Sequence, residues 1–387
     1  MTPRIPFNKP YVTGKELHYV AQAVTQGKIA ADGHFTKLCA RLLETEFDVA
    51  KALMTPSCTA ALEIAALLCD LSAGDEVILP SYTFVSTASA VARTGARPVF
   101  VDIRPDTLNI DEELIERAIT PRTKAIFPVH YAGVSCEMDR IMEIADRHDL
   151  VVVEDAAQGV NSAYHGRPLG SIGHLAAYSF HETKNYVCGE GGALCVNAPE
   201  FVERAEILRE KGTNRSRFLR GMVDKYTWVD VGSSYVPSEM VCAYLYAQLE
   251  NLEPIAQRRR DAYNLYRRHL TPLQLQGYLT LPTIPEGCTS NYHMFYLLLA
   301  DLDARDGLIA HLKQQGITAV FHYVPLHTSP VGTRLGYRPG DLPVTEDLSV
   351  RLVRLPLYCE LQEFEQMEVI SHIQEFVTGR VSRRSAA

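Results

Sequence analysis

The sequence predicts an α/β fold in which a large, mostly parallel sheet is followed by a smaller α+β unit. The first observation is that short continuous apolar runs alternate with helical patterns between about residues 50 and 200. Continuous apolar strands are typical of a parallel sheet that helices cover on both faces. The second observation is a strand, helix and strand after about residue 275, which indicate a separate and smaller unit.

Six apolar runs are the predicted strands of the large sheet, and helical patterns separate several of them. The strands are expected at 76–79, 98–101, 125–129, 150–153, 176–179 and 193–196. The helices are expected at 59–71, 86–94, 111–118 and 138–148. In such sheets ligands bind at the carboxyl ends of the strands, so polar residues that follow a strand are the candidates for function.

The rest of the chain predicts helices and the smaller unit. Residues 200–270 read as mainly helical, with a break at 230–235. A strand at 294–299, a helix at 306–315 and a strand at 319–323 follow. We therefore expect a large domain over residues 1–250 that includes an N-terminal helical segment, a small C-terminal domain over 251–380, and a disordered tail over 381–387.

Composition excludes several classes of protein. The chain has 387 residues, of which 47% are hydrophobic and 22% charged, as in a folded protein of about two domains. Its formal net charge of −8 offers no global basic field to nucleic acid or to an acidic membrane. The nine cysteines form no CxxC pair and no cluster with histidine at metal-ligand spacing, so we expect no metal site and a reducing cytoplasm. The first residues carry no apolar secretory core, and no apolar run is long enough to span a membrane.

Lys184 follows a predicted strand and lies in a polar loop. The loop reads Ser-Phe-His-Glu-Thr-Lys-Asn over 179–185, and the glycine-rich segment 189–192 comes shortly after it. A lysine among hydroxyls and glycines at a strand end is suited to Schiff-base chemistry with an aldehyde cofactor. An ordinary surface lysine is the alternative, and the presence of other parts of a cofactor site decides between the two.

Two further segments suit a phosphorylated aromatic cofactor. Ser57, Cys58 and Thr59 precede a helix whose free N–H groups and positive end attract a phosphate, although a plain helix cap is the alternative. Phe84 follows the strand at 76–79, where an aromatic ring can cover one face of a planar ligand. For Phe84 the alternative is a core residue.

Asp155 supplies the acidic partner that a pyridine cofactor needs. It ends a buried apolar strand, where a carboxylate is costly unless it is paired or functional. There it is placed to hold a protonated pyridine nitrogen, and Gln158 to reach the phenolic oxygen of the ring. A helix N-cap is the alternative for Asp155. One strand separates Asp155 from Lys184, which allows the two to lie on neighbouring strand ends and face one cofactor.

Taken together, these residues resemble the DegT/DnrJ/StrS sugar aminotransferases, which are pyridoxal 5'-phosphate (PLP) enzymes of the aspartate aminotransferase-like fold type I. The resemblance runs from Ile5 to about residue 375, nearly the whole chain. Within the family the likeness is greatest to the dTDP-4-amino-4,6-dideoxygalactose transaminases. The segments that carry it are 55–60, 80–87, 128–134, 179–185, 210–216 and 320–327.

The resemblance implies a role for each cofactor residue. Lys184 is the Schiff-base lysine, Asp155 holds the pyridine nitrogen, and His181 is a candidate catalytic residue beside Lys184. The other residues implied to bind the cofactor are Gln158 at the phenolic oxygen, Phe84 on the ring face, and Ser57, Cys58, Thr59 and Ser179 at the phosphate. Many relatives supply an asparagine from the partner subunit to this phosphate, and Ser234 occupies its place here.

The resemblance also implies where a sugar nucleotide binds. The substrate-binding residues it points to are Lys28, Asn214, Arg215, His322, Tyr323 and His327. Lys28 and Arg215 would neutralise the diphosphate, with arginine offering a bidentate fork. Solvated surface cations are the alternative for Lys28 and Arg215, and structurally satisfied strand-end histidines are the alternative for His322 and His327.

The function implied is PLP-dependent transamination by a homodimer with shared active sites. Glutamate gives up its amino group, which leaves pyridoxamine 5'-phosphate and 2-oxoglutarate, and Lys184 serves as acid and base. The amine then passes to C4 of dTDP-4-keto-6-deoxy-D-glucose to give a dTDP-4-amino-4,6-dideoxyhexose, either galacto or gluco.

Other functions stay open or are disfavoured. A C3 aminotransferase acting on a dTDP-3-keto-6-deoxyhexose and a non-catalytic PLP-fold binding protein are the alternatives, and the second is disfavoured because Lys184 and Asp155 are both present. A related dehydratase carries histidine in place of the lysine, so Lys184 argues against it. A Rossmann dehydrogenase is disfavoured because no GxGxxG opens a helix after an early strand.

Overall fold

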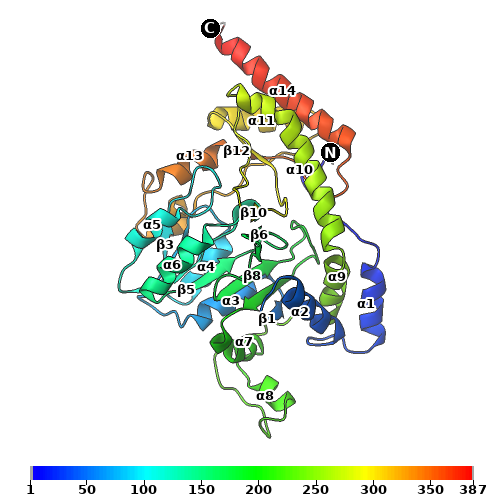
Figure 1. The fold of residues 1–387 in the computed structure, drawn as a ribbon, viewed down its shortest axis with the longest axis vertical. Helices are drawn as coiled ribbons and strands as arrows, with labels where there is room; N and C mark the ends of the chain where they lie inside the picture. Colours follow the sequence, from blue (N-terminus) through cyan, green and yellow to red (C-terminus); the bar gives the residue numbers. More distant parts are fainter. Residues whose placement is uncertain (1–2, 386–387) are drawn as a thin grey trace.

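The computed structural model describes residues 3–385, with side chains as far as residue 379. Its largest sheet has seven strands in the order β1-β9-β8-β5-β4-β2-β3. β1, β3, β5 and β8 of this sheet are labelled in Figure 1. Neighbouring strands run parallel except at β9, which is antiparallel to both β1 and β8. The predicted mixed, mostly parallel sheet is therefore confirmed. Its strands are β1 (Lys51–Thr55), β2 (Glu76–Pro80), β3 (Arg97–Val101), β4 (Thr123–Ile126), β5 (Val151–Asp155), β8 (Leu175–Ser179) and β9 (Gly192–Val196).

All six predicted strands lie in this sheet, and the seventh, β1, was not predicted. β1 reads Lys-Ala-Leu-Met-Thr, and alanine, leucine and methionine favour helices when no partner strand is considered. Pairing with β9 from Lys51 to Thr55 overrides that preference. The strand expected at 125–129 ends at Ile126, because Pro128 cannot donate a hydrogen bond to the ladder.

Alternate residues of each strand pack against helices on opposite faces of the sheet. Val77 and Leu79 belong to the core under one set of helices, whereas Ile78 between them faces the other set. The first set is α3 (Cys58–Leu68), α4 (Val85–Arg93) and α7 (Val202–Arg209). The second set is α2 (His34–Glu46), α5 (Glu112–Ala118), α6 (Met138–His148) and α9 (Glu239–Leu249), and α1 (Glu16–Thr25) packs on α9.

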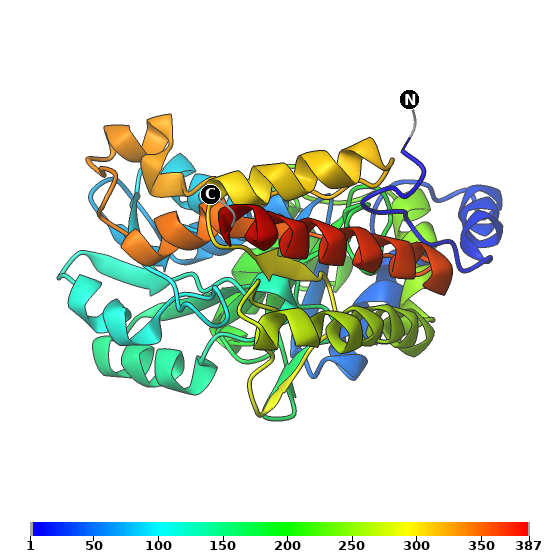
Figure 2. The same ribbon diagram turned by 90° about the horizontal axis from the view of Figure 1, so that it is seen from above.

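The C-terminal part of the chain forms a separate core around two antiparallel strands. β11 (Tyr296–Leu298) pairs with β12 (Leu352–Arg354), and α10 (Leu252–Leu275), α11 (Leu302–Gln314) and α14 (Glu363–Ser385) cover them. α11 and α14 run side by side (Figure 2). α11 begins earlier than predicted because Asp301 accepts a hydrogen bond from the Ala304 amide at 2.7 Å and caps it. The strand expected at 319–323 does not form; Val320 makes only an isolated bridge to Arg354.

Short elements complete the chain. A small three-stranded sheet has the order β10-β6-β7, with β6 (Ala163–Tyr164), β7 (Arg167–Pro168) and β10 (Cys288–Thr289). The remaining helices are α8 (Arg215–Leu219), α12 (Pro330–Arg334) and α13 (Pro343–Arg351), with 3-10 turns at Tyr131–Gly133, Pro199–Phe201 and Leu326–Thr328. α8 and its flanking loop project from the bottom of the molecule in Figure 1. None of the helices within residues 3–385 has both the length and the apolar composition needed to cross a membrane.

The predicted domain division stays a prediction. α9 ends at Leu249 and α10 begins at Leu252, next to the expected boundary. Ile5, expected in the large domain, is buried in the C-terminal core and bridges Ile317. Of the expected disordered tail, residues 381–385 continue α14, and 386–387 lie outside the described residues.

Candidate active site

The carboxyl ends of β1, β2, β5 and β8 lie at one edge of the sheet, beside a cavity of about 440 Å³. This convergence follows from the shared direction of the four strands. The predicted site residues that line the cavity are Ser57, Cys58, Thr59, Phe84, Asp155, Gln158, Ser179, His181, Lys184, His322 and Tyr323. The predicted residues that do not line it are Lys28, Asn214, Arg215, Ser234 and His327.

Lys184 reaches the cavity from a tight loop that follows β8. The loop is held by hydrogen bonds from the Lys184 amide to the His181 carbonyl and from the Glu182 amide to the Gly189 carbonyl, both at 2.9 Å. Burial lowers the pKa of the Lys184 amine, while the nearby Cys58 and Asp155 oppose that effect. A lowered pKa leaves more of the amine unprotonated at neutral pH, which is the form that attacks a carbonyl.

Asp155 ends β5 and faces the same cavity. Its Oδ2 accepts a hydrogen bond from Thr87 Oγ1 at 2.6 Å, and its Oδ1 accepts one from the Ala157 amide at 3.1 Å. Burial raises the pKa of this carboxyl, although both hydrogen bonds act in the other direction. A buried carboxylate of this kind gains most from a cationic N–H partner, which is what a pyridinium ring offers.

Glu154, the residue before Asp155, points away from the cavity. Its carboxylate accepts hydrogen bonds from the amides of Gly170, Ile172 and Gly173 and contacts His130 Nε2 at 2.9 Å. Because His130 Nδ1 accepts from the Cys136 amide, the proton of that ring lies on Nε2. Glu154 therefore has every partner it needs and anchors the strand end that carries Asp155.

The helix start at Ser57 forms as predicted. Ser57 Oγ accepts a hydrogen bond from the Ala60 amide at 3.1 Å and caps α3, and Thr59 Oγ1 lies 2.8 Å from Ser86 Oγ. A Cβ on Gly192 would lie 2.5 Å from the Cys58 nitrogen, so only glycine lets β9 pass this close to the loop. The N-terminus of α3 is thereby directed at the cavity, where its N–H groups favour an anion.

Phe84 and Gln158 bound the cavity in different ways. Phe84 is 57% exposed and is not a core residue, so its ring is free to cover a ligand. The Gln158 side chain accepts from the Ala132 amide at 2.7 Å and donates to Tyr323 Oη at 2.9 Å. Gln158 is thus held in place by Tyr323 across the cavity wall.

Three of the four predicted histidine and tyrosine residues lie on the cavity. His322 and Tyr323 stack with ring centroids 3.6 Å apart, and His322 Nδ1 is 2.7 Å from Tyr131 Oη. Burial lowers the pKa of His322 well below its usual value, so its ring is neutral at pH 7. His181 Nδ1 contacts Thr183 Oγ1 at 2.9 Å.

His327 lies outside the cavity. Its ring is fully buried, with Nδ1 2.7 Å from Ser81 Oγ and Nε2 2.9 Å from Glu346 Oε1. Both ring nitrogens are therefore occupied by protein partners. This arrangement favours the alternative, a structurally satisfied histidine, over contact with substrate.

Four predicted site residues lie outside the Lys184 cavity of their own chain. Lys28 and Arg215 line a second hollow of about 520 Å³. Asn214 accepts a hydrogen bond from the Thr227 amide at 2.7 Å, and Ser234 bridges Glu210. The adjoining segment exposes a group of large apolar side chains, here called the 218–231 surface, made of Phe218, Leu219, Met222, Tyr226, Trp228, Val229 and Val231.

Phe7, His293 and Arg354 are among the residues of the cavity wall that sequence reasoning missed. Phe7 and Arg354 come from opposite ends of the chain, so no local pattern connects them. One signal was available: Arg354 interrupts the apolar run Leu-Val-Arg-Leu at 352–355, and a cation within such a run requires a partner or a function.

Comparison with known proteins gives consistent matches along the whole chain. The profile of the DegT/DnrJ/EryC1/StrS aminotransferase family matches residues 10–374. A pleiotropic regulatory protein of Geobacillus stearothermophilus is 38% identical over 318 residues, which cover 82% of each chain. A dTDP-4-dehydro-2,3,6-trideoxy-D-glucose 4-aminotransferase of Saccharopolyspora spinosa is 33% identical over 393 residues, covering 98% of this chain and 99% of its own. A Streptococcus pneumoniae structure in the PMP form, assigned as a sugar aminotransferase, superposes with a TM-score of 0.91 at 28% identity, over 98% of this chain and 99% of its own.

Proposed function

The chain belongs to the DegT/DnrJ/EryC1/StrS aminotransferase family, and from this membership we propose that it transfers the amino group of glutamate to C4 of dTDP-4-keto-6-deoxy-D-glucose. It is a PLP-dependent sugar aminotransferase. The products would be a dTDP-4-amino-4,6-dideoxyhexose and 2-oxoglutarate. Support for C4 comes from the Saccharopolyspora spinosa relative, whose name gives that position on a dTDP-linked 4-keto sugar. The nine cysteines, none of which is in a disulfide, support a cytoplasmic location.

One observation carries the catalytic proposal: burial shifts the pKa values of Lys184 and Asp155 toward each other in one cavity. The pKa of the amine is lowered and that of the carboxyl is raised. Such a pair in a cavity is typical of acid–base chemistry. Lys184 Nζ would carry a proton between the α-carbon of the donor and the cofactor, and the loop hydrogen bonds would hold it there.

The residues around this pair fit the cofactor. PLP, when bound, supplies an aldehyde that takes up the amine and a ring that accepts electrons. The N-terminus of α3, with Ser57, Cys58 and Thr59, and Ser179 would bind its phosphate. Asp155 would hold a proton on the ring nitrogen. Phe84 would cover one face of the ring and exclude water from it.

A second copy of the chain would complete the site. Lys28, Asn214, Arg215 and Ser234 lie outside the cavity of their own chain and near the exposed 218–231 surface. A two-fold dimer that buries this surface would bring these residues to the cavity of the partner. Lys28 and Arg215 would then neutralise the diphosphate of the nucleotide sugar.

The experiment is to identify the product by NMR after incubation with dTDP-4-keto-6-deoxy-D-glucose and glutamate. Loss of the yellow colour on adding glutamate, followed by an amine at C4, would support the proposal, and the coupling constants would give the galacto or gluco configuration. No amination of this 4-keto sugar, with amination of a dTDP-3-keto-6-deoxyhexose supplied in its place, would replace it with the C3 alternative. Colour that persists with glutamate would instead favour a binding role, in line with the regulatory name of the Geobacillus stearothermophilus relative.

A further inference from the structure

Arg354, the last residue of β12, lies in the cavity wall without a partner for its charge. Its backbone amide donates a hydrogen bond to the Val320 carbonyl at 2.7 Å, which fixes the position of the Arg354 backbone. Its Nε is buried without a hydrogen bond, and its guanidinium makes no ion pair within the described part of the chain. Its contact is with the ring of Phe7, whose centroid lies 4.7 Å from Cζ.

Arg354 is half-buried, and the two arginines that are fully buried within the described residues have protein partners. Arg259 donates to the carbonyls of Tyr292 and His293. Arg209 donates to the Met54 carbonyl and pairs with Asp32 at 2.8 Å. An unpaired guanidinium in a desolvated position is costly, so the cavity at Arg354 is suited to an anionic ligand.

The position of Arg354 selects among the anions of this reaction. In an amino acid the α-carboxylate is bonded to the same carbon as the reacting amine. In a nucleotide sugar the diphosphate is separated from C4 by the sugar ring. Arg354 lines the same cavity as Lys184, and its charge is close enough to lower the pKa of the lysine amine. An anion beside the reacting amine is therefore the carboxylate of the donor.

We propose that Arg354 binds the α-carboxylate of the amino donor, with Phe7 holding the plane of the guanidinium. A planar fork of N–H groups matches a carboxylate with two parallel hydrogen bonds. The neighbouring His322 is neutral, so Arg354 is the cation that this part of the cavity presents. The inference rests on the proposed function, because it takes the donor to be an amino acid.

The test compares Arg354→Gln and Arg354→Lys with Arg351→Gln. Arg351 lies three residues earlier, pairs with Asp347 and does not line the cavity, so it is a matched control. The half-reaction with L-glutamate is followed by the loss of cofactor absorbance, and the reverse half-reaction is followed with the amino sugar nucleotide. Calorimetry measures the binding of 2-oxoglutarate, a readout that does not need turnover. Circular dichroism confirms that each variant is folded.

We expect Arg354→Gln to raise the glutamate concentration needed for half-saturation about 100-fold and to lower the affinity for 2-oxoglutarate by about the same factor. Arg354→Lys should cause smaller changes in both. Arg351→Gln should match the wild type, and the amino sugar half-reaction should change less than about threefold. Arg354→Gln should weaken the binding of L-alanine, whose only carboxylate is the α-carboxylate, as strongly as it weakens the binding of glutamate. Unchanged glutamate and 2-oxoglutarate binding, or an equal loss for the amino sugar, would overturn the inference. A wild-type enzyme that glutamate fails to bleach would count against the proposed function, while the 2-oxoglutarate titration would still decide the role of Arg354.

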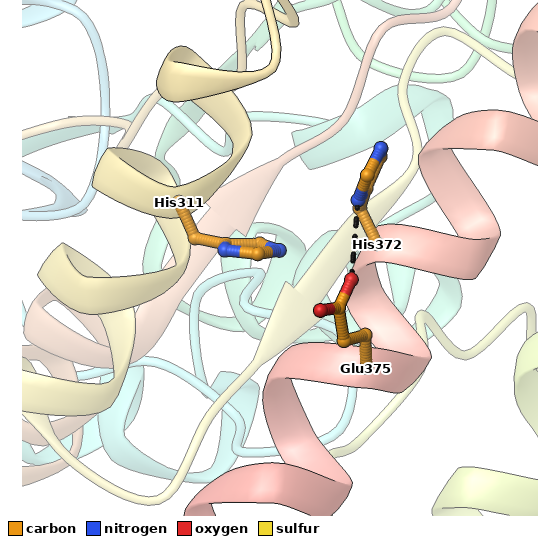
Figure 3. Close-up of side chains that lie close together, drawn as sticks. All are labelled: His311, His372 and Glu375. Carbon is orange, nitrogen blue, oxygen red and sulfur yellow. Dashed lines mark ion pairs between the residues drawn. The ribbon is translucent and has the colours of Figure 1, made fainter.

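An independent observation concerns His311, His372 and Glu375, which do not line this cavity and lie on two other elements. Figure 3 shows His311 on α11 turned toward the pair His372–Glu375 on α14. One ligand atom from each lies within 4.8 Å of the others. His311 Nε2 and His372 Nδ1 are buried without hydrogen bonds, and Nδ1 lies 3.5 Å from Glu375 Oε2.

These atoms match the preferences of zinc. Imidazole nitrogens and a carboxylate oxygen are common zinc ligands, and the spacing of His372 and Glu375 puts both on one face of α14. Glu368 Oε1 lies 3.9 Å from His372 Nε2, on the side of the ring away from Glu375. Glu368 pairs with Arg4, and the Nδ1 atom of His372 is the ring nitrogen nearer to Glu375.

We infer that His311, His372 and Glu375 bind a zinc ion that links α11 to α14. Sequence spacing gave no sign of it, because the two histidines lie on separate helices. The metal would tie the last helix to the C-terminal core, at a place that the transamination chemistry does not use.

The test removes metal with EDTA and then adds zinc chloride. Mass spectrometry measures the amount of bound zinc, and a thermal melt measures the melting temperature. Zinc should bind at one per chain and raise the melting temperature. His311→Phe, which keeps the ring packing against Phe376, and Glu375→Gln should each weaken zinc binding at least about tenfold. His269→Ala on α10 is the control and should bind as the wild type does. Zinc uptake that both His311→Phe and Glu375→Gln leave unchanged, or no uptake at all, would overturn the inference.

Discussion

The cavity around Lys184 and the segment from Asn214 to Ser234 both contain predicted site residues. In the first region these residues line one cavity, and in the second they lie outside it. At the cavity, side chains from four strand ends converge, and Lys184 and Asp155 have pKa values shifted by burial. In the other segment, Asn214, Arg215 and Ser234 do not line that cavity and lie next in sequence to the exposed 218–231 surface. The proposed dimer would account for this difference, because one chain would build the chemical part of the site and a second chain would complete substrate recognition.

Replacing Lys184 tests the cavity that a single chain forms, and it has the largest expected effect. Lys184→Ala should lower kcat by about 10⁴-fold, because no other cavity residue with a lowered pKa carries an amine. Steady-state rates and the absorbance of the bound cofactor measure it. Lys313→Ala, an exposed lysine on α11, should leave both unchanged. A Lys184→Ala enzyme with a rate near that of the wild type would contradict the assignment.

Mixing two inactive variants tests whether Arg215 contributes to the cavity of a second chain. Arg215→Ala should be strongly impaired, and so should Lys184→Ala. When subunits of the two exchange, about a quarter of wild-type activity should return, because half the dimers are mixed and each of these holds one intact site. Native mass spectrometry confirms that mixed dimers form. Mixed dimers without activity would show that Arg215 serves its own chain or none.

Asp155→Asn tests whether burial raises the pKa of the carboxyl group that faces the cavity. Because burial raises the pKa of Asp155, the folded cofactor-free protein binds a proton more tightly than the unfolded chain does. Its free energy of unfolding therefore falls as the pH rises from about 3.8 through the folded pKa. Asp155→Asn should raise the melting temperature of the cofactor-free protein at about pH 7, and the difference should vanish near pH 4.

The same substitution should act in the opposite direction on catalysis. With cofactor bound, Asp155→Asn should lower kcat about 10²- to 10³-fold, because the ring nitrogen loses its charged partner. Thermal melts across the pH range and steady-state rates measure the two effects. A variant that loses stability at neutral pH would indicate that the carboxylate is structural.

Phe84→Ala is expected to have the smallest effect. The ring is 57% exposed and contributes little to the core, so the melting temperature of the cofactor-free protein should hardly change. Cofactor affinity should fall about 3- to 10-fold through loss of stacking. Equilibrium dialysis with PLP measures the affinity. A large drop in stability with unchanged affinity would restore the core-residue alternative.

Sequence patterns predicted the parts of the fold whose signals are local. β2, β3, β5, β8 and β9 were found because each is a continuous apolar run between turns or helices. β1 was missed because its residues favour helices, and only pairing with β9 makes it a strand. Val320, expected within a strand, makes a single bridge with Arg354.

The candidate site was predictable where each residue follows a strand or opens a helix. Ser57, Asp155 and Lys184 each have such a position, and the parallel sheet brings them together. Phe7 and Arg354 meet only because the N-terminal segment joins the C-terminal core, which no window of sequence contains. The expectation for His327 depended on the family alone, and its contacts with Ser81 and Glu346 are tertiary.

Trp228 gives the molecule its own optical probe. It is the single tryptophan in the sequence, and its side chain is 72% exposed on the 218–231 surface. Intrinsic fluorescence excited at the indole band therefore reports one position and no other. In the proposed dimer this indole would leave water and its emission would shift to shorter wavelength, so a dilution series read in a fluorimeter would follow dissociation without any label.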